Sequence, residues 1–487
     1  MQGLLSPPSF RRFAGRLLGR LALICLLGTW ISAQAESKAQ PKARSKPRVV
    51  AAQPPTTQPL PVSAGRCGDE EAARAEPQLA TSTGTSAAQH DPRSHLIELI
   101  ELAQQRSRQV GVARLLEAAA QDEVREAQLG SLPQIQMTLQ SGLAGSRQGT
   151  INGPSGLEAR LGVQLQGPIW DWGRQQRLVE WRQQLAAAAL ASRQGQAEQI
   201  ALQTVSLSLD RSRYHLQQQV YTQYARKMAC LVEQLEAITQ FDKGRASELV
   251  QAQKSQQQAE LALLSTQDVI SSLETRLRRL VGDPLPPVAS LAAVLSRVPD
   301  YKRLESELID APDVASANAQ ALASQRLADA VLAGQKPQLG YLGAANARGG
   351  NGRSADWLGG VQLTIPLWRA TDAPQLAAAR RRADAVALQR DETVEAKVWR
   401  LQELHDGALQ SLEKARRVTE LIRSSESLRV STYQQWQLLG RRSLFDVMGA
   451  EGDYYSLRVA HVNAIFDAQQ VVALMGSMGR GVTSLLR

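Results

Sequence analysis

The chain has 487 residues, a formal net charge of +10 and only 4% aromatic residues. This length allows several domains, and the scarcity of aromatic residues excludes a large Phe-rich globular core in favour of long helices with small contact residues. Four arginines lie in the first 35 residues, so the charge of the remainder is about +6 (+10 − 4), which indicates ordinary solubility and no nucleic-acid partner.

Residues 1–35 have the parts of a secretory signal peptide, and the basic start consists of Arg11, Arg12, Arg16 and Arg20. The apolar core Leu21–Trp30 is too short for a spanning helix, and Ala33-Gln34-Ala35 offers a small-x-small site for cleavage after Ala35. A lipoprotein signal ending at Cys25 is disfavoured because the preceding Ile24 is bulky.

Residues 36–91 are rich in Pro, Ser and Thr and hold too few apolar residues to offset the entropy of ordering, so we predict a disordered arm. Cys67 lies in this arm, and Cys230 lies on a predicted helix. An oxidising compartment would permit a bridge between them, but nothing requires one, and composition favours two unpaired thiols.

The first structural unit is predicted over residues 92–282 and begins with a helix over Pro92–Gly130. Two strands follow, Gln134–Gln140 and Leu157–Gln166, in which apolar residues alternate with a glutamine-rich polar set. The polar face indicates contact with water, and about ten residues is the length that a tilted strand needs to cross a bilayer.

A long helix over Arg174–Gln240 and a return helix ending at Gly282 complete this unit, and the turn between them holds Lys243, Gly244 and Arg245. Some 65 helical residues would span about 100 Å. No single globular domain buries such a helix, so we predict a coiled coil or a barrel of helices.

The same order of elements returns in a second unit over residues 310–480, which predicts an internal two-fold repeat. Its strands are Gln338–Asn346 and Trp357–Ile365, and its long helix is Asp372–Leu439. Residues 283–309 form a linker or equatorial segment between the units, and residues 481–487 form a C-terminal tail.

Three tryptophans follow the strand pairs, namely Trp170, Trp172 and Trp368. Ordinary packing would explain them, but their place at strand ends favours anchors at a membrane–water interface.

Four strands in one chain are too few to close a barrel, and a membrane does not tolerate open sheet edges. The smallest spanning barrels have about eight strands. We therefore expect the chain to oligomerise, and a homotrimer would give a twelve-stranded barrel on an α-helical tube.

Three motifs, in this order along the chain, resemble those of the TolC family of outer-membrane efflux proteins: PIWDWGRQ, PDVASANAQA and GRRSLFDVMGAEGDYYSLRVA. The resemblance covers roughly residues 92–480. It implies a mainly α-helical fold with a small β portion, in which three chains share a transmembrane β-barrel and an α-barrel crossing the periplasm. It also implies outer membrane lipid, a periplasmic adaptor and an ABC or proton-driven inner-membrane transporter as partners, with GRRSLFDVM closest to members of type I secretion.

The resemblance assigns Arg442 and Asp446 to a gate at the inner tip of the second hairpin. Three family gate positions differ here, because a second acidic position is Gly449, its counterpart in the first hairpin is Val250, and a locking tyrosine is Gln437. The alternative for Arg442 and Asp446 is a surface pair worth a few tenths of a kcal/mol.

The turns themselves are expected to form the tip that docks the adaptor, through Lys243, Gly244, Arg245, Gly440 and Arg441. The alternative for the basic residues is a solvated rim. Gly244 and Gly440 also suit plain helix turns, because glycine tolerates a positive φ.

No enzymatic chemistry is expected. The histidines His90, His95, His215, His405 and His461 show no metal-ligand spacing. The chain contains no GxxxxGK loop and no nucleophile–base motif, so we expect no cofactor, no metal and no ATP hydrolysis. The alternatives to a passive export channel are a periplasmic coiled-coil adaptor, a structural scaffold and the stalk of a surface appendage.

Overall fold

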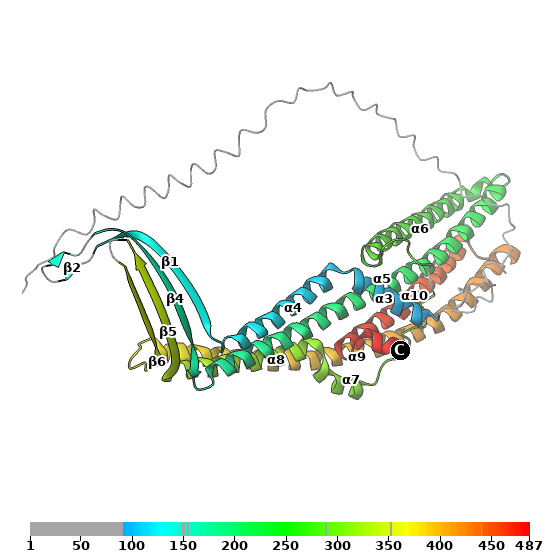
Figure 1. The fold of residues 1–487 in the computed structure, drawn as a ribbon. Helices are drawn as coiled ribbons and strands as arrows, with labels where there is room; N and C mark the ends of the chain where they lie inside the picture. Colours follow the sequence, from blue (N-terminus) through cyan, green and yellow to red (C-terminus); the bar gives the residue numbers. More distant parts are fainter. Residues whose placement is uncertain are drawn as a thin grey trace, which may run out of the picture. The chain divides into compact units, whose positions relative to one another are not determined.

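The fold comes from a computed structural model, which describes residues 91–487 except 146, 149–150, 153–154, 288–289, 351–352 and 440 (Figure 1). The predicted signal peptide, Cys67, Gly440 and nearly all of the predicted arm therefore lie outside the described residues. None of the described helices combines the length and the apolar character that are needed to cross a membrane.

The helices account for most of the described chain. They are α3 (Pro92–Arg106), α4 (Arg108–Leu129), α5 (Arg174–Thr239), α6 (Ala246–Val281), α7 (Tyr301–Glu307), α8 (Pro312–Gly334), α9 (Asp372–Leu439), α10 (Leu444–Met478) and α11 (Val482–Leu486), with 3-10 turns η1 (Lys243–Arg245) and η2 (Leu308–Asp310). Both predicted long helices are present, since α5 has 66 residues and α9 has 68.

The predicted helix over Pro92–Gly130 is broken at one residue. Ser107 has extended backbone angles, and its side chain accepts a hydrogen bond from the backbone N–H of Val110 at the start of α4. Serine is a favoured N-cap residue, but Ser107 is flanked by Arg106 and Arg108, which are good helix formers and do not mark a helix end.

The long helices pack lengthwise against one another, as Figure 1 shows for α4, α5, α8 and α9. Ion pairs join α5 to both neighbours: Arg182 lies 2.5 Å from Glu123 on α4, and Glu180 lies 3.3 Å from Arg326 on α8. Alanines fill many of the contacts, which lets helix backbones approach closely and explains the low aromatic content.

Four strands form one antiparallel sheet in the order β1-β4-β5-β6. Their bounds are β1 (Gln134–Ala144), β4 (Gly156–Trp170), β5 (Gln338–Gly349) and β6 (Ser354–Thr364). A separate two-residue pair, β2 (Arg147–Gln148) and β3 (Ile151–Asn152), lies in the first loop and was not predicted. Both outer strands, β1 and β6, have one edge without a strand partner among the described residues.

The register places the alternating residues on two opposite faces. Leu139, Leu161, Ala347 and Ala355 form one row across all four strands of the apolar face. Thr138, Gly162 and Asn346 form a row of the polar face, where a side chain on Gly162 would lie 2.9 Å from the oxygens of both neighbours. The predicted alternation of apolar and polar residues is therefore present in the folded sheet.

No part of the described chain covers the apolar face. Ile135 is 74% exposed, Leu157 is 71% exposed and Trp357 is 83% exposed. Water-soluble proteins rarely expose an apolar patch of this extent, so the face requires an apolar partner.

The motif Pro168–Gly173 turns the chain from β4 into α5. The ladder to β5 shifts between Pro168 and Trp170, which accommodates the proline that lacks a backbone donor. Trp172 and Gly173 have φ of 59° and 75°, and the Asp171 carboxylate accepts hydrogen bonds from the backbone N–H groups of Gly173 (3.0 Å) and Gln175 (2.7 Å). Asp171 thus caps the long helix.

The main apolar core lies where α3, α5, α6, α9, α10 and α11 meet. Residues 291–295 of the predicted linker insert into it, and the buried Gln469 holds them by donating to the Ala292 carbonyl (2.9 Å) and accepting from the Leu295 N–H (3.1 Å). The predicted tail contains α11, whose Val482 and Leu486 are also buried in this core.

We predict that Phe466→Ala destabilises the fold by about 3–5 kcal/mol, because Phe466 on α10 is 1% exposed within this core. A lower midpoint of thermal unfolding in detergent would be the measurement. Phe445→Ala on the same helix is the control, since Phe445 is 47% exposed. Equal shifts for the two variants would contradict this placement of the core.

Candidate functional site

The turn of the first hairpin joins α5 to α6 through η1. The Asp242 carboxylate accepts a hydrogen bond from the Gly244 N–H (3.0 Å), and the Arg245 guanidinium lies 3.6 Å from the same carboxylate. Gly244 lies within this turn, and it is not among the described glycines with a positive φ. The turn is a 3-10 turn capped by Asp242, and a side chain on Gly244 would lie 3.1 Å from its Oδ1.

The turn of the second hairpin carries the predicted gate pair. Arg442 Nη1 lies 3.9 Å from Asp446 Oδ2, and both side chains are about half exposed. Arg442 also donates to the Gln435 side chain on α9 (3.2 Å). Every described partner of the pair therefore belongs to the second hairpin.

Asp446 has a structural role as well. Ser443 and Asp446 form a capping box at the start of α10, in which each side chain accepts from the backbone N–H of the other residue at 3.3 Å. This is the reciprocal arrangement that satisfies two donors at a helix start. A test of the gate must therefore separate the charge of Asp446 from its capping.

An apolar cluster packs the two hairpins together near their turns. It contains Met228, Leu231, Val232 and Leu235 of α5, Ala252 of α6, Trp436 of α9, and Leu444, Val447 and Met448 of α10. The structure thus brings the ends of both predicted hairpins into one packed unit.

A buried ionic cluster lies between these hairpins and was missed by the sequence analysis. The Glu451 side chain on α10 is 1% exposed, and it lies 3.8 Å from Lys227 Nζ of α5 and 3.4 Å from Arg429 Nη1 of α9. One carboxylate therefore faces a cation from each hairpin. The only signal in the sequence was a charged residue at an inward helical position, which does not identify its partner.

Aromatic rings surround the cluster. The Lys227 ammonium lies 4.6 Å from the Tyr433 ring centroid, and the Arg429 guanidinium lies 4.6 Å from that of Tyr454. The neighbouring Arg458 donates to Gln223 of α5 (2.6 Å), which adds a second polar link between the hairpins. Cations on ring faces gain a further stabilising contact when they are desolvated.

Burial sets the protonation behaviour of this cluster. It raises the pKa of Glu451 above 4.5, although Arg429 and Lys227 act in the opposite direction. Burial alone would lower the pKa of Arg429, but Glu451 and the tyrosines outweigh it and raise that pKa. In this cluster the attraction between opposite charges thus opposes the cost of removing them from water, as expected for a buried ion pair.

Two positions at which the sequence departs from the resembled gate pattern lie in open space. A side chain built on Gly449 of α10 would meet no atom within 4 Å, and Val250 of α6 is 65% exposed. Either position therefore has room for a carboxylate that this chain lacks.

The three tryptophans lie at the end of the sheet that joins the helices. Trp170 belongs to β4 itself, and its ring stacks edge-on against Trp172 at 6.0 Å. Trp172 donates from Nε1 to the Pro337 carbonyl (2.7 Å), and Trp368 is 85% exposed. Rings that combine an exposed body with a bonded N–H suit an interface between water and lipid.

The prediction of unpaired thiols is wrong for Cys230, which is disulfide-bonded. Over the described ranges, no three residues of the types His, Cys, Asp and Glu are placed to hold a metal ion.

Several solved membrane proteins share this fold at low sequence identity. CusC, studied for its folding and transmembrane channel formation, has a TM-score of 0.72 at 15% identity, covering 82% of this chain and 96% of its own. VceC of Vibrio cholerae has a TM-score of 0.68 at 18% identity, covering 80% of this chain and 97% of its own. The open state of the MtrE channel from Neisseria gonorrhoeae has a TM-score of 0.66 at 17% identity, covering 83% of this chain and 96% of its own.

No family model matches the chain, and no curated protein matches it in sequence. The structural likeness covers most of both chains and confirms the predicted fold class, mainly helical with one small antiparallel sheet.

We predict that Glu451→Gln changes the pH dependence of stability. A carboxyl whose pKa is raised on folding stabilises the fold below its unfolded pKa, and this contribution is lost as pH rises through the folded pKa. As pH falls from the raised value towards 4.5, the unfolding midpoint of the wild type should therefore rise relative to that of the variant.

Thermal unfolding in detergent across this pH range would measure the difference between the two proteins. Glu426→Gln is the matched control, because Glu426 lies 3.6 Å from the same Arg429 but is about half exposed. If the difference between the unfolding midpoints of the wild type and Glu451→Gln stays constant with pH, burial does not raise the pKa of Glu451.

Proposed function

We propose that the chain is a TolC-like channel of the outer membrane of a Gram-negative bacterium, extending into the periplasm and conducting solutes passively. The observation that carries this proposal is the sheet, whose apolar face is uncovered and whose edge strands lack a partner on one side. Lipid would cover the face, and further copies of the chain would pair the edges.

Three copies would place four strands each in a closed barrel of twelve, which exceeds the smallest spanning barrels of about eight strands. The helices of the two units, residues 92–282 and 310–480, would line a tube below the barrel. The fold shared with the outer-membrane channel MtrE supports this assembly.

The tip of the hairpins would hold the gate and the docking surface. Three copies of Arg442 and Asp446 would surround the axis there, and Lys243, Gly244, Arg245 and Arg441 would present a basic surface to an adaptor. Two links between α5 and α10, Lys227 to Glu451 and Gln223 to Arg458, would hold the hairpins together above the gate. This arrangement compensates for the missing carboxylates at Gly449 and Val250.

The partners would be a periplasmic adaptor and an ABC or proton-driven inner-membrane transporter, in type I secretion or in efflux. An adaptor or scaffold role for this chain is less well supported, because neither role requires a sheet with an uncovered apolar face.

Planar bilayer recordings together with gels of heated and unheated outer membranes test the proposal. We predict stepwise single-channel currents from the purified protein and an oligomeric band that heating converts to the monomer. A protein that is soluble without detergent and produces no current would contradict the proposed function.

We predict that Arg442→Ala and Asp446→Asn raise the resting conductance by about twofold or more, because each removes a charge from the narrow tip. Asparagine retains an oxygen that accepts hydrogen bonds, so the capping contact is kept. Bilayer recordings at low salt would measure the change.

Ser443→Ala is the matched control for this experiment. It removes the capping hydroxyl and leaves both charges in place. An increase for Ser443→Ala with none for Asp446→Asn would assign the effect to helix capping and would refute the electrostatic gate.

A further inference from the structure

A row of polar side chains crosses the sheet near its loop end. The register aligns Gln140 of β1 with Arg160 of β4, Arg160 with Arg348 of β5, and Arg348 with Ser354 of β6. Residues that lie directly opposite in antiparallel strands share one face, with Cα atoms about 5 Å apart. The row belongs to the polar face, together with Asn346.

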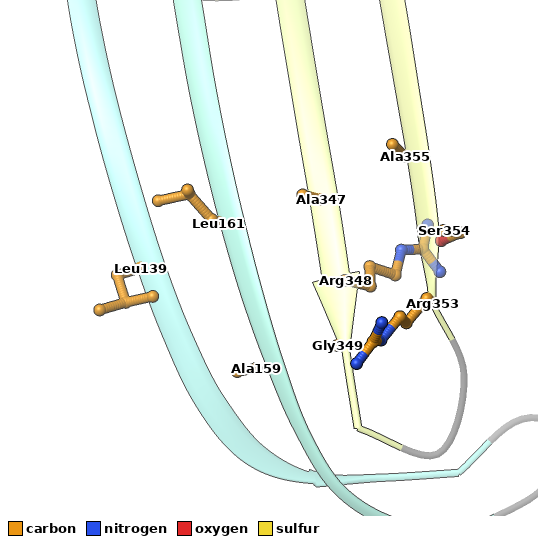
Figure 2. Close-up of a pocket in the computed structure, with 9 residues that line it drawn as sticks. All are labelled: Leu139, Ala159, Leu161, Ala347, Arg348, Gly349, Arg353, Ser354 and Ala355. Carbon is orange, nitrogen blue, oxygen red and sulfur yellow. The ribbon is translucent and has the colours of Figure 1, made fainter.

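Two arginines directly opposite each other repel, and like charges in such a pair destabilise a sheet. Arg160 is neutralised in part, because Glu158 on the same strand lies 2.5 Å from its Nε. Arg348 has no ion-pair partner among the described residues. In Figure 2 it extends from β5 towards Ser354, with no carboxylate among the side chains drawn.

The surroundings do not supply the missing negative charge. The loop residues 145–155 and 350–353 contain Arg147 and Arg353 and no Asp or Glu. The carboxylate of Asp356, in the next row, accepts a hydrogen bond from the Asn346 amide (2.9 Å). This end of the sheet thus has four arginines and two carboxylates per chain.

The rest of the polar face is uncharged. Its side chains along the strands are mainly amides and hydroxyls: Gln134, Gln136, Thr138, Gln164, Gln166, Gln362 and Thr364. Any charge selection along this face therefore has to arise at its loop end, where Arg160 and Arg348 lie near Glu158 and Asp356.

We propose that Arg160 and Arg348 form an anion-binding belt inside the barrel, which takes the phosphate or carboxylate group of a passing solute. The inference rests on the proposed channel function, since it requires the polar face to line the lumen. Guanidinium groups bind such oxyanions through two parallel hydrogen bonds, and a bound anion would relieve the repulsion between the two arginines.

Reversal potentials in a KCl gradient test the belt. The wild-type channel should prefer chloride, and Arg160→Gln/Arg348→Gln should lower the chloride-to-potassium permeability ratio by about threefold or more. Glu158→Gln should raise that ratio, because it removes the carboxylate that neutralises Arg160. A purely structural role of these residues predicts no such opposite shifts.

Arg353→Gln is the matched control. Arg353 lies one residue before Ser354, so the period of two places it towards the opposite, apolar face. Its substitution removes the same charge from the same end of the sheet and should leave the reversal potential unchanged.

Inorganic phosphate added on the loop side supplies a second readout. It should reduce the wild-type current, and Arg348→Lys should weaken this block while keeping chloride selectivity, because lysine keeps the charge but not the planar fork. This variant also keeps the test decisive if the double variant fails to assemble.

Two results would overturn the anion-binding belt and leave the channel function intact. One is an unchanged reversal potential in Arg160→Gln/Arg348→Gln, and the other is an equal change of that potential in Arg353→Gln. A wild-type protein without any current would refute the channel function itself, and the belt with it.

Discussion

The structure depends on one constraint, which is that the four-stranded sheet is incomplete within a single chain. Its apolar face lies uncovered, and β1 and β6 each leave a row of backbone donors and acceptors without a strand partner in the described part of the chain. Unpaired backbone groups in an apolar medium are strongly destabilising, so lipid alone does not satisfy such a sheet. Neighbouring copies and lipid together would satisfy both requirements, and the long helices would extend the same assembly.

Apolar packing and buried ion pairs join the two hairpins in different ways. Apolar packing around Leu231 and Val447 supplies a favourable contact. The ion pairs of Glu451 add little net stability. The positive charges of Lys227 and Arg429 lower the pKa of Glu451, but burial raises that pKa by more. Their contribution is geometric, since they hold one hairpin at a defined position against the other.

Much of this fold could be predicted because its signals are local. Alternation and turn composition located all four strands of the sheet. The proline-free stretch after Arg174 located α5, and the a/d rhythm together with the repeated order of elements located α9. The break at Ser107 was missed because the residues beside it, Arg106 and Arg108, are good helix formers and neither Pro nor Gly adjoins it. The Glu451 cluster was missed because its members come from three helices, and pairing across such distances leaves no periodicity in a single sequence.

Hydrogen exchange of the backbone amides in β1 and β6, measured by mass spectrometry on the detergent-purified protein, tests the central claim most directly. If neighbouring copies pair these edges, the amides of β1 and β6 will be protected as strongly as those of the inner strands β4 and β5. Rapid exchange of every second amide along β1 and β6, beside protected inner strands, would show open edges and would contradict the shared barrel.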